Sequence, residues 1–354
     1  MILPGTDPQA LAQAAQCLRD GGLVGMPTET VYGLAADACQ PGAVAQIFQS
    51  KGRPSDHPLI VHVVGVEQVG FWVSEVPDFA RRLMAAFWPG PLTLILLRRA
   101  GVAEQAAGGQ ATLGLRCPSH PVAQALLQQA LALGVRGVAA PSANRFGRVS
   151  PTTAAHVVQE LGHDLLVLDG GACAVGIEST IVDCSRGMPA LLRPGMLPMQ
   201  ALSAAAGQTV WPMGSAAQAA HDLSGASVHG LSHAMPAPKV SGTLAAHYAP
   251  RATVRLLSLA QMWDRHHARS LPPGSSCAVW SRQPIAGPGL QHHPMPSDPA
   301  LAAQVLFACL RQWDDDGVAE IWVEPPPCDP AWDGVRDRLQ RAAAAAPVQQ
   351  LDSR

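Results

Sequence analysis

A chain of 354 residues exceeds the usual size of a single domain, so its length predicts two domains. Hydrophobic residues make up 48% of the chain and charged residues 14%, which excludes a disordered protein and favours well-packed folds. The formal net charge of −2 excludes a global attraction to nucleic acid and leaves only a local basic patch open. We therefore expect direct nucleic-acid binding to be absent or weak.

The N-terminal sequence MILPGTDPQALAQ lacks the basic region and the apolar run that are typical of a signal peptide. No apolar stretch reaches the roughly eighteen residues that a membrane-spanning helix needs. The eight cysteines are scattered singly, and without a C-x-x-C pair they predict neither a zinc ribbon nor a dithiol redox site. We expect a soluble, cytoplasmic protein with reduced, structural thiols and no membrane partner.

The N-terminal part of the chain alternates helical and strand patterns. Asp7-Pro8 predicts a helix start, because Asp caps helices and proline suits their first position, and Gly21-Gly22 predicts the end of that helix. Further helices are expected at 41–50, 77–88 and 121–133. Apolar strands are expected at 23–26, 59–64, 92–97, 111–116, 138–140, 165–168 and 180–182. The alternation predicts an α/β domain over 1–206 with a mostly parallel or mixed sheet.

The pattern fails from 207 to about 246, where Ala, Gly, Ser, Pro and His prevail. This composition predicts a long linker, which we extend over 207–250. A second α/β pattern follows, with strands expected at 253–257, 277–280 and 320–323 and helices at 259–269, 299–313 and 332–344. It predicts a small Rossmann-like domain over 251–354. The domain lacks G-x-G-x-x-G, so nothing local indicates a dinucleotide.

The segment 27–63 is the most informative in the chain. A strand leads to a turn rich in threonine, a helix is expected next, and that helix ends in Lys51-Gly52-Arg53-Pro54. Two cations around a glycine suit a polyphosphate, because Arg offers a bidentate fork, Lys a point charge and Gly a close approach. The alternative is a solvated helix end, with His62 as an ordinary sheet histidine and Thr30 as a helix cap.

Three further features carry polar or charged side chains. Hydroxyl and amide groups of Ser142, Asn144 and Ser150 lie beyond the strand predicted to end at 140, where open α/β sheets bind ligands. The segment 176–183 places hydroxyls before another strand, and Arg116 and Arg193 add two cations. Taken singly, plain turn chemistry explains Ser142, Asn144 and Ser150 better, and surface ion pairs explain the two arginines equally well.

The order of motifs is more specific than any one of them. PTETVYGL, KGRP, PLIVHV, LRCP, APSAN, SPT, GIESTIVD and LLRPG follow one another as in the YrdC-like domain of threonylcarbamoyl-AMP synthases, a resemblance that covers most of 5–205. The later segment KVSGTLAAHYAP resembles the linker motif of the long-form members, and the C-terminal domain is similar too. Common versions of that motif carry Pro-Gly-Met where this chain has Ser241-Gly242-Thr243, whereas His-Tyr-Ala-Pro is intact.

The resemblance implies a YrdC-like twisted mixed-sheet domain followed by a smaller Rossmann-like α/β domain. It also implies that L-threonine, bicarbonate and ATP form threonylcarbamoyl-AMP and pyrophosphate, and that the product passes to tRNA-modifying proteins. By residue-to-residue transfer, L-threonine is expected to be bound by Thr30, His62, Arg116, Ser142 and Ser179. ATP is expected to be bound by Arg53, His57, Thr112, Asn144, Ser150, Arg193 and Tyr248, with Lys51 at the phosphates. The family usually carries Asn where His57 stands.

The residues agree with that chemistry. They offer no Ser-His-Asp or Cys-His arrangement, and attack by a carbamate oxygen needs no proton removed from the nucleophile. Catalysis can therefore rest on alignment and on cations, which makes Lys51 and Arg53 the candidate catalytic residues. Mg²⁺ is expected to arrive with ATP, bound largely through phosphates. We further expect the segment around His247-Tyr248 to cover the nucleotide pocket.

Two alternative functions remain at this point. A carbamoyl-transfer enzyme using the same domain would carry acylphosphatase and zinc-finger regions, which the unpaired cysteines disfavour. A noncatalytic RNA-binding module would show salt-dependent RNA binding, which the balanced charge disfavours. The pairs His266-His267 and His292-His293 suggest surface residues rather than a metal site, because no further ligands accompany them.

Overall fold

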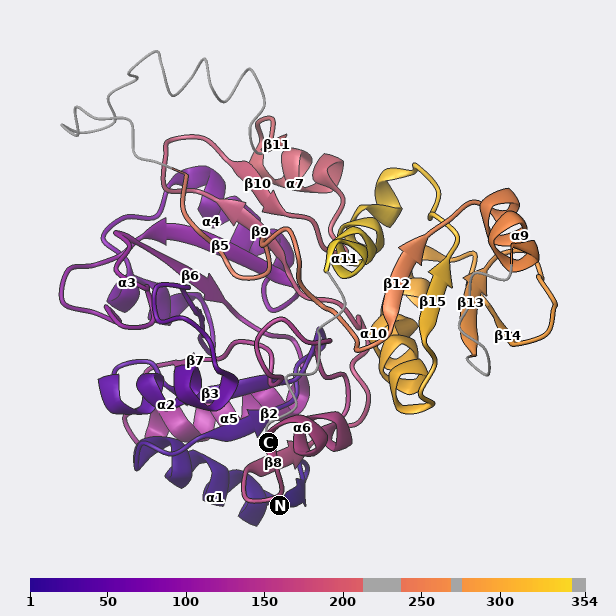
Figure 1. Ribbon diagram of the computed structural model, residues 1–354. Helices are drawn as coiled ribbons and strands as arrows, with labels where there is room; N and C mark the ends of the chain where they lie inside the picture. Colours follow the sequence, from indigo (N-terminus) through magenta and orange to yellow (C-terminus); the bar gives the residue numbers. More distant parts are fainter. Residues whose placement is uncertain (213–236, 269–275, 346–354) are drawn as a thin grey trace. The chain divides into compact units, whose positions relative to one another are not determined.

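The structure, a computed structural model, describes residues 1–212, 237–268 and 276–345 (Figure 1). The chain divides into two compact units: Met1–Phe146 with Pro151–Thr243, and Gly147–Ser150 with Leu244–Arg354. Of the stretch predicted as a linker, 237–243 thus belong to the first unit and 244–250 to the second. Its middle part, 213–236, lies outside the described residues.

Eleven strands of the first unit, counted over the described residues, form one sheet in the order β1-β8-β2-β3-β7-β4-β6-β5-β9-β10-β11. They are β1 (Ile2–Pro4), β2 (Val24–Met26), β3 (Gly33–Asp37), β4 (Ile60–His62), β5 (Leu92–Leu97), β6 (Thr112–Arg116), β7 (Val138–Ala139), β8 (Leu166–Asp169), β9 (Thr180–Asp183), β10 (Ala190–Arg193) and β11 (Trp211–Pro212). Because β5 pairs antiparallel with β6 and parallel with β9, the predicted mixed sheet is confirmed.

The helices of this unit are α1 (Pro8–Arg19), α2 (Pro41–Lys51), α3 (Val69–Trp72), α4 (Asp78–Phe87), α5 (Pro121–Ala132), α6 (Ala154–Leu161) and α7 (Met199–Ala206). The start of α1 is as predicted: the Asp7 carboxylate accepts a hydrogen bond from the Gln9 N–H at 2.9 Å, and Pro8 follows it. α2 ends at Lys51 because Gly52 adopts the left-handed conformation, with φ of 61°.

The sheet of the first unit is buried on both faces. Along β3, Leu34 and Ala36 pack into one apolar cluster, whereas Ala35 between them packs into a second cluster with residues of α1 and α5. Successive side chains of a strand point to opposite faces, so the two clusters lie on opposite sides of the sheet. Strands buried on both faces are continuously apolar, which is why 92–97 could be predicted to the residue.

β3 was not predicted from the sequence; it lies between the threonine-rich turn and the helix expected at 41–50, which α2 confirms. Its residues Gly-Leu-Ala-Ala-Asp include none of the β-branched or aromatic types that favour strands. Pairing with β2 and β7 forms the strand instead. As a result Thr30 caps no helix, and the alternative interpretation of Thr30 as a helix cap is wrong. Also missing from the sequence-based prediction are α3, α6, α7, β1, β10 and β11.

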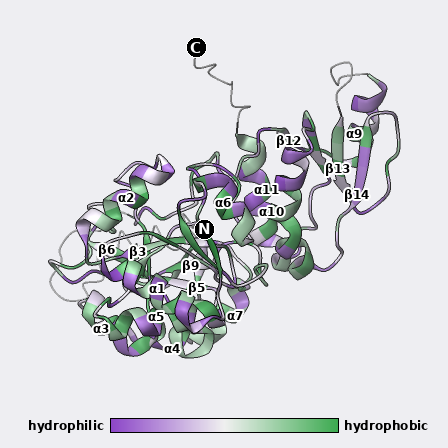
Figure 2. Ribbon diagram, turned by 90° about the horizontal axis from the view of Figure 1, so that it is seen from below, coloured by the Kyte–Doolittle hydropathy of each residue, from purple (hydrophilic) through white to green (hydrophobic). Residues whose placement is uncertain are grey.

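The second unit contains a parallel sheet of four described strands in the order β12-β15-β13-β14. Its elements are β12 (Thr253–Leu256), β13 (Cys277–Ser281), β14 (Leu290–Pro294), β15 (Glu320–Val323), α9 (Leu259–His267), α10 (Pro299–Asp315) and α11 (Asp333–Ala344). The all-parallel sheet with helices confirms the Rossmann-like prediction. β14 was missed because Leu-Gln-His-His-Pro is largely hydrophilic, as Figure 2 shows, and an edge strand can be polar.

The expected end of α9 at 269 lies outside the described residues. Within the described ranges, no helix combines the length and the apolar character that crossing a membrane requires.

Candidate functional site

Three neighbouring strands of the first unit bring polar side chains to one place. His62 at the end of β4 and Arg116 at the end of β6 are Cα partners in a parallel pair, and Thr93 of β5 is the antiparallel partner of Arg116. Residues directly opposite one another on paired strands point to the same face of the sheet. His62, Thr93 and Arg116 therefore form a row of buried polar groups across the middle of the sheet.

Arg116 lies in a buried network rather than at the surface. Its Nη2 is 2.7 Å from Oε1 of Glu29, and the side chains of Arg116 and Glu29 are 5% and 9% exposed. Its Nη1 donates to Oγ1 of Thr30 at 2.8 Å, and the Thr30 and Thr28 hydroxyls are 2.9 Å apart. The alternative of a surface ion pair is wrong, because water does not screen charges buried this deeply.

His62 is buried and electrically neutral. Its Nδ1 has no hydrogen-bond partner among the described residues. Burial, and then the positive charge of Arg116, lowers the pKa of His62 to about 3. The imidazole therefore carries no charge near neutral pH. A buried polar atom without a partner is uncommon, and it indicates a place where a ligand group completes the hydrogen bonding.

Ser179 connects this row to a second arginine. Its hydroxyl lies 2.8 Å from the Thr93 hydroxyl. Arg193 of β10 donates to the Ser179 carbonyl oxygen from Nε at 3.1 Å and from Nη2 at 2.8 Å. Arg193 is buried, so it also is no surface ion-pair partner. Buried polar groups thus extend from the turn before β3 to the strand β10, with Arg116 and Thr93 related by strand pairing.

Ser241 joins Arg193 to Arg53. Nη1 of Arg193 donates to the Ser241 carbonyl oxygen at 2.8 Å, and Nη2 of Arg53 donates to the Ser241 hydroxyl at 2.9 Å. The Ser241 hydroxyl in turn donates to the Pro58 carbonyl oxygen at 3.0 Å. Thr112 lines one small cavity together with Pro58 and Ser241. The segment that departs from the common linker motif therefore contacts both arginines expected to bind ATP.

Lys51 is buried, not a solvated helix end. Its Nζ donates to the Ser142 carbonyl oxygen at 2.6 Å and also to that of Asn144. The N–H of Phe146 donates to the Lys51 carbonyl oxygen at 2.8 Å. Burial, and then the charge of Arg53, lowers the pKa of Lys51 to about 7. The lysine fastens the loop 142–146 to α2, and its protonated form, with two donors so engaged, keeps one for a ligand.

Two other predicted residues flank this loop. Asn144 is buried, and its Nδ2 donates to the Arg145 carbonyl oxygen at 2.7 Å. His57 is half-buried, with its ring edge-on to Phe146 at a centroid distance of 5.3 Å. Burial, followed by the charge of Arg53, lowers the pKa of His57. The guanidinium of Arg53 lies 5.5 Å from the Phe146 ring centroid, so both residues share this aromatic neighbour.

Ser150 and Tyr248 belong to the second unit. The Ser150 carbonyl oxygen accepts a hydrogen bond from Nε of Arg311 at 3.3 Å. Tyr248 has a positive φ of 61°, its ring stacks on Phe307 at 5.4 Å, and the Arg338 guanidinium lies 5.4 Å from the ring centroid. The conformation is uncommon for a residue other than glycine, and these packing contacts hold it.

Sequence analysis did not single out Glu29, Thr28 or Thr93. Thr93 has a recognisable signal, since it is the one hydroxyl in the apolar run Leu-Thr-Leu-Ile-Leu-Leu of β5. Glu29 gives a weaker one, a carboxylate between two threonines directly after a buried strand. Neither signal identifies the partner, because both partners lie far away in the sequence.

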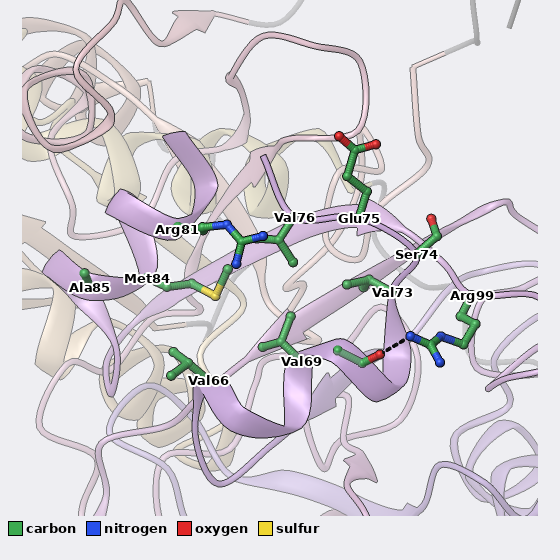
Figure 3. A pocket seen from close by; sticks show the side chains of 11 residues that line it. Val66, Val69, Val73, Ser74, Glu75, Val76, Arg81, Met84, Ala85 and Arg99 are labelled. Atoms are coloured by element: carbon green, nitrogen blue, oxygen red, sulfur yellow. Dashed lines mark hydrogen bonds between the residues drawn. The ribbon is translucent and has the colours of Figure 1, made fainter. Parts of the chain in front are cut away.

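The first unit also has a separate hollow of about 590 Å³ beside α3 and α4 (Figure 3). Its lining includes the apolar side chains of Val69, Val73 and Met84 and the charged ones of Arg81 and Glu75. None of the predicted site residues lines it. We place the candidate site at the buried polar network instead, since chemistry on a charged substrate needs charged and hydrogen-bonding groups.

Two family descriptions match the chain. The one described as "Telomere recombination" matches residues 16–195, and the one described as "Threonylcarbamoyl-AMP synthase, C-terminal domain" matches 210–344. Among similar proteins, "Threonylcarbamoyl-AMP synthase" of Bacillus subtilis is 34% identical over 96% of this chain and 94% of its own length. The protein of the same name from Pyrococcus abyssi is 40% identical over 68% of this chain and 66% of its own length.

Solved structures agree with these matches. The structure of P. abyssi Sua5 complexed with L-threonine has a TM-score of 0.78 and 33% identity, and the match covers 94% of each chain. Another structure of P. abyssi Sua5 has a TM-score of 0.81 and 32% identity, covering 97% of this chain and 96% of that one. Both domains are thus matched in sequence and in structure, and the chain belongs to the threonylcarbamoyl-AMP synthase family.

Proposed function

We propose that this enzyme forms threonylcarbamoyl-AMP and pyrophosphate from L-threonine, bicarbonate and ATP, and that it acts as a nucleotidyltransferase. The observation that carries the proposal is the buried network of Thr28, Glu29, Thr30 and Arg116 beside an unpartnered His62 nitrogen. This network combines a cation for a carboxylate with hydroxyls for a small polar side chain. The L-threonine complex of P. abyssi Sua5 supports the same assignment.

The reaction has two bond-forming steps. The amine of L-threonine first combines with bicarbonate to give a carbamate and water. A carbamate oxygen then attacks the α-phosphorus of ATP, and the bond from that phosphorus to pyrophosphate breaks. No proton leaves the nucleophile in the second step, so alignment of the reactants and stabilisation of phosphate charge are what the protein must supply.

The proposed roles are those that the family resemblance implies, carried over residue by residue. Thr30, His62, Arg116, Ser142 and Ser179 would bind L-threonine. Arg53, His57, Thr112, Asn144, Ser150, Arg193 and Tyr248 would bind ATP. Arg53 would stabilise charge on the transferring phosphate, and Lys51 would add one N–H donor while fastening the loop that carries Ser142 and Asn144. We also propose that the segment around His247-Tyr248 covers the nucleotide.

Mg²⁺ would accompany the nucleotide. Among the described residues, no group of three or more His, Cys, Asp or Glu side chains could cage a metal ion. We propose an ion that takes most of its ligands from phosphate oxygens and water, as Mg²⁺ commonly does. When bound, the ion would neutralise charge on the departing pyrophosphate.

The product is a reactive mixed anhydride, so an acyl-transfer reaction must consume it before water does. We propose transfer of the threonylcarbamoyl group to tRNA by partner proteins. The formal net charge of −2 favours hand-off over direct tRNA binding by this chain.

The test is pyrophosphate release with each substrate omitted in turn. We expect release only with L-threonine, bicarbonate and ATP together, and AMP-linked product in equal amount. Equal turnover without L-threonine would contradict the proposal and favour the carbamoyl-transfer alternative.

A further inference from the structure

Glu29 has a buried carboxylate, and neither the sequence motifs nor the roles proposed above assign it a function. It lies in the turn after β2 and is 7% exposed. Burying a carboxylate is costly unless partners compensate for lost hydration. A surface position or a neutral side chain would avoid that cost. The placement therefore indicates a function for its charge.

Three chain segments fix the position of Glu29. Its Oε1 lies 2.7 Å from Nη2 of Arg116. Its Oε2 accepts a hydrogen bond from the Ser119 N–H at 3.1 Å, and its backbone carbonyl oxygen accepts one from the Val175 N–H at 2.7 Å. Both the side chain and the main chain are thus held, and the carboxylate cannot turn without breaking backbone contacts.

Arg116 receives its orientation from this arrangement. Thr30 accepts from Nη1 at 2.8 Å while Glu29 faces Nη2, so two corners of the guanidinium are held from the same turn. Nε of Arg116 is buried and has no hydrogen-bond partner among the described residues. Since unmade hydrogen bonds of buried charged groups are costly, that free donor marks where a ligand acceptor belongs.

The neighbouring groups define the ligand's chemistry. The unpartnered Nδ1 of His62 belongs to the strand neighbour of Arg116, so two unsatisfied polar groups come from paired positions. A small molecule with a carboxylate and further polar groups would satisfy both. Because Glu29 offsets the charge of Arg116, the site stays close to neutral before such a molecule enters.

We propose that Glu29 is a positioning residue of the amino-acid subsite: it acts through Arg116, holding the guanidinium so that its free donors meet the substrate carboxylate. This inference rests on the proposed function, because it takes the substrate to be L-threonine. Glu29 itself touches no substrate in this proposal, so its removal alters binding of L-threonine and leaves binding of ATP intact.

The test compares Glu29→Gln with Glu320→Gln. Glu320 is a matched control, since it is a buried carboxylate of the second unit that accepts from Arg255 at 3.0 Å and from Arg265 at 2.8 Å. For Glu29→Gln we expect KM for L-threonine and its calorimetric Kd to rise about 10- to 30-fold, and KM for ATP to change less than threefold, as loss of one charge-assisted contact predicts. Glu320→Gln should leave all three constants unchanged.

A merely structural role has a different signature. Both Glu29→Gln and Glu320→Gln would then have a lower melting temperature. Both would also have a smaller active fraction, and therefore a lower kcat, but an unchanged KM for L-threonine. If Glu29→Gln does not fold, Glu29→Asp is tested instead. Its shorter side chain keeps the charge but holds it farther from Arg116, so we expect KM and Kd for L-threonine to rise about threefold to fivefold. An unchanged Kd and KM for L-threonine in the folded variant overturns the proposal. Wild-type turnover without L-threonine would instead show that the proposed function itself is wrong.

Discussion

Two buried ion-paired carboxylates, Glu320 in the second unit and Glu29 in the first, differ in how fully their surroundings are hydrogen-bonded. In the second unit, Glu320 accepts hydrogen bonds from Arg255, Arg265 and, at 2.6 Å, from Nε1 of Trp322. In the first unit, Arg116 faces Glu29 and Thr30 but keeps a buried Nε without a partner among the described residues, and its strand neighbour His62 keeps a buried Nδ1 likewise.

The difference separates structural charges from functional ones. A buried ion pair whose hydrogen bonds are all made holds a fold together and needs nothing further. A buried pair that leaves donors unmade is costly until a ligand arrives. Substitutions that affect donors without a hydrogen-bond partner should therefore change substrate binding. Substitutions at ion pairs whose hydrogen bonds are all made should alter only stability.

Arg116→Met tests this comparison most severely. It leaves Glu29 buried without its cation, so we expect the free energy of unfolding to fall by about 3–5 kcal/mol. We also expect kcat/KM for L-threonine to fall roughly 1000-fold, or about 4 kcal/mol of binding and transition-state stabilisation. Chemical denaturation and steady-state kinetics measure the two effects.

The double variant Arg116→Met with Glu29→Gln separates these effects. It removes both charges, so we expect it to recover a large part of the lost stability and none of the lost activity. Recovery of activity in the double variant would show that Arg116 does not contact the substrate.

Lys51→Ala should have the next largest effect. We expect kcat/KM to fall roughly 30- to 1000-fold, or about 2–4 kcal/mol, because the variant loses a cation near the phosphates and the fastening of the loop 142–146. Since two carbonyl oxygens lose their donor, the free energy of unfolding should fall by about 1–3 kcal/mol as well.

The matched control for Lys51 is Arg19→Ala, which removes an exposed cation from the last turn of α1. It should change the free energy of unfolding by less than about 1 kcal/mol and leave kinetics unaltered. If Lys51→Ala behaves like this control, the lysine neither fastens the loop nor acts in catalysis.

Ser241→Ala should have the smallest effect. It deletes the hydroxyl that accepts from Arg53 and donates to the Pro58 carbonyl oxygen. We expect KM for ATP to rise about twofold to fivefold, since one of several hydrogen bonds that orient Arg53 is lost, and KM for L-threonine to stay constant. Thr243→Ala is the control, because the Thr243 hydroxyl donates to the Val240 carbonyl oxygen within the same segment. Equal effects of the two variants would mean that Ser241 merely shapes the segment.

The sequence by itself determined the alternation of helices and strands, the bounds of β5 and β15, the start of α1 and the Rossmann-like character of the second unit. Periodicity, helix caps and apolar runs are local signals, and the chain carries them within a few residues. The order of the motifs likewise led to the family and to the set of candidate residues. The roles of those residues in binding and catalysis stay predictions.

Only the tertiary structure decided which charges are buried and with what partners. β3 lacks strand-forming residues and exists because β2 and β7 pair with it. Lys51 reads as a helix-end cation in the sequence, yet it reaches carbonyl groups 91 and 93 positions away. Arg116 finds Thr30 at a separation of 86 positions, and Glu29 beside it. Such contacts depend on how the sheet brings strand ends together, which no local pattern encodes.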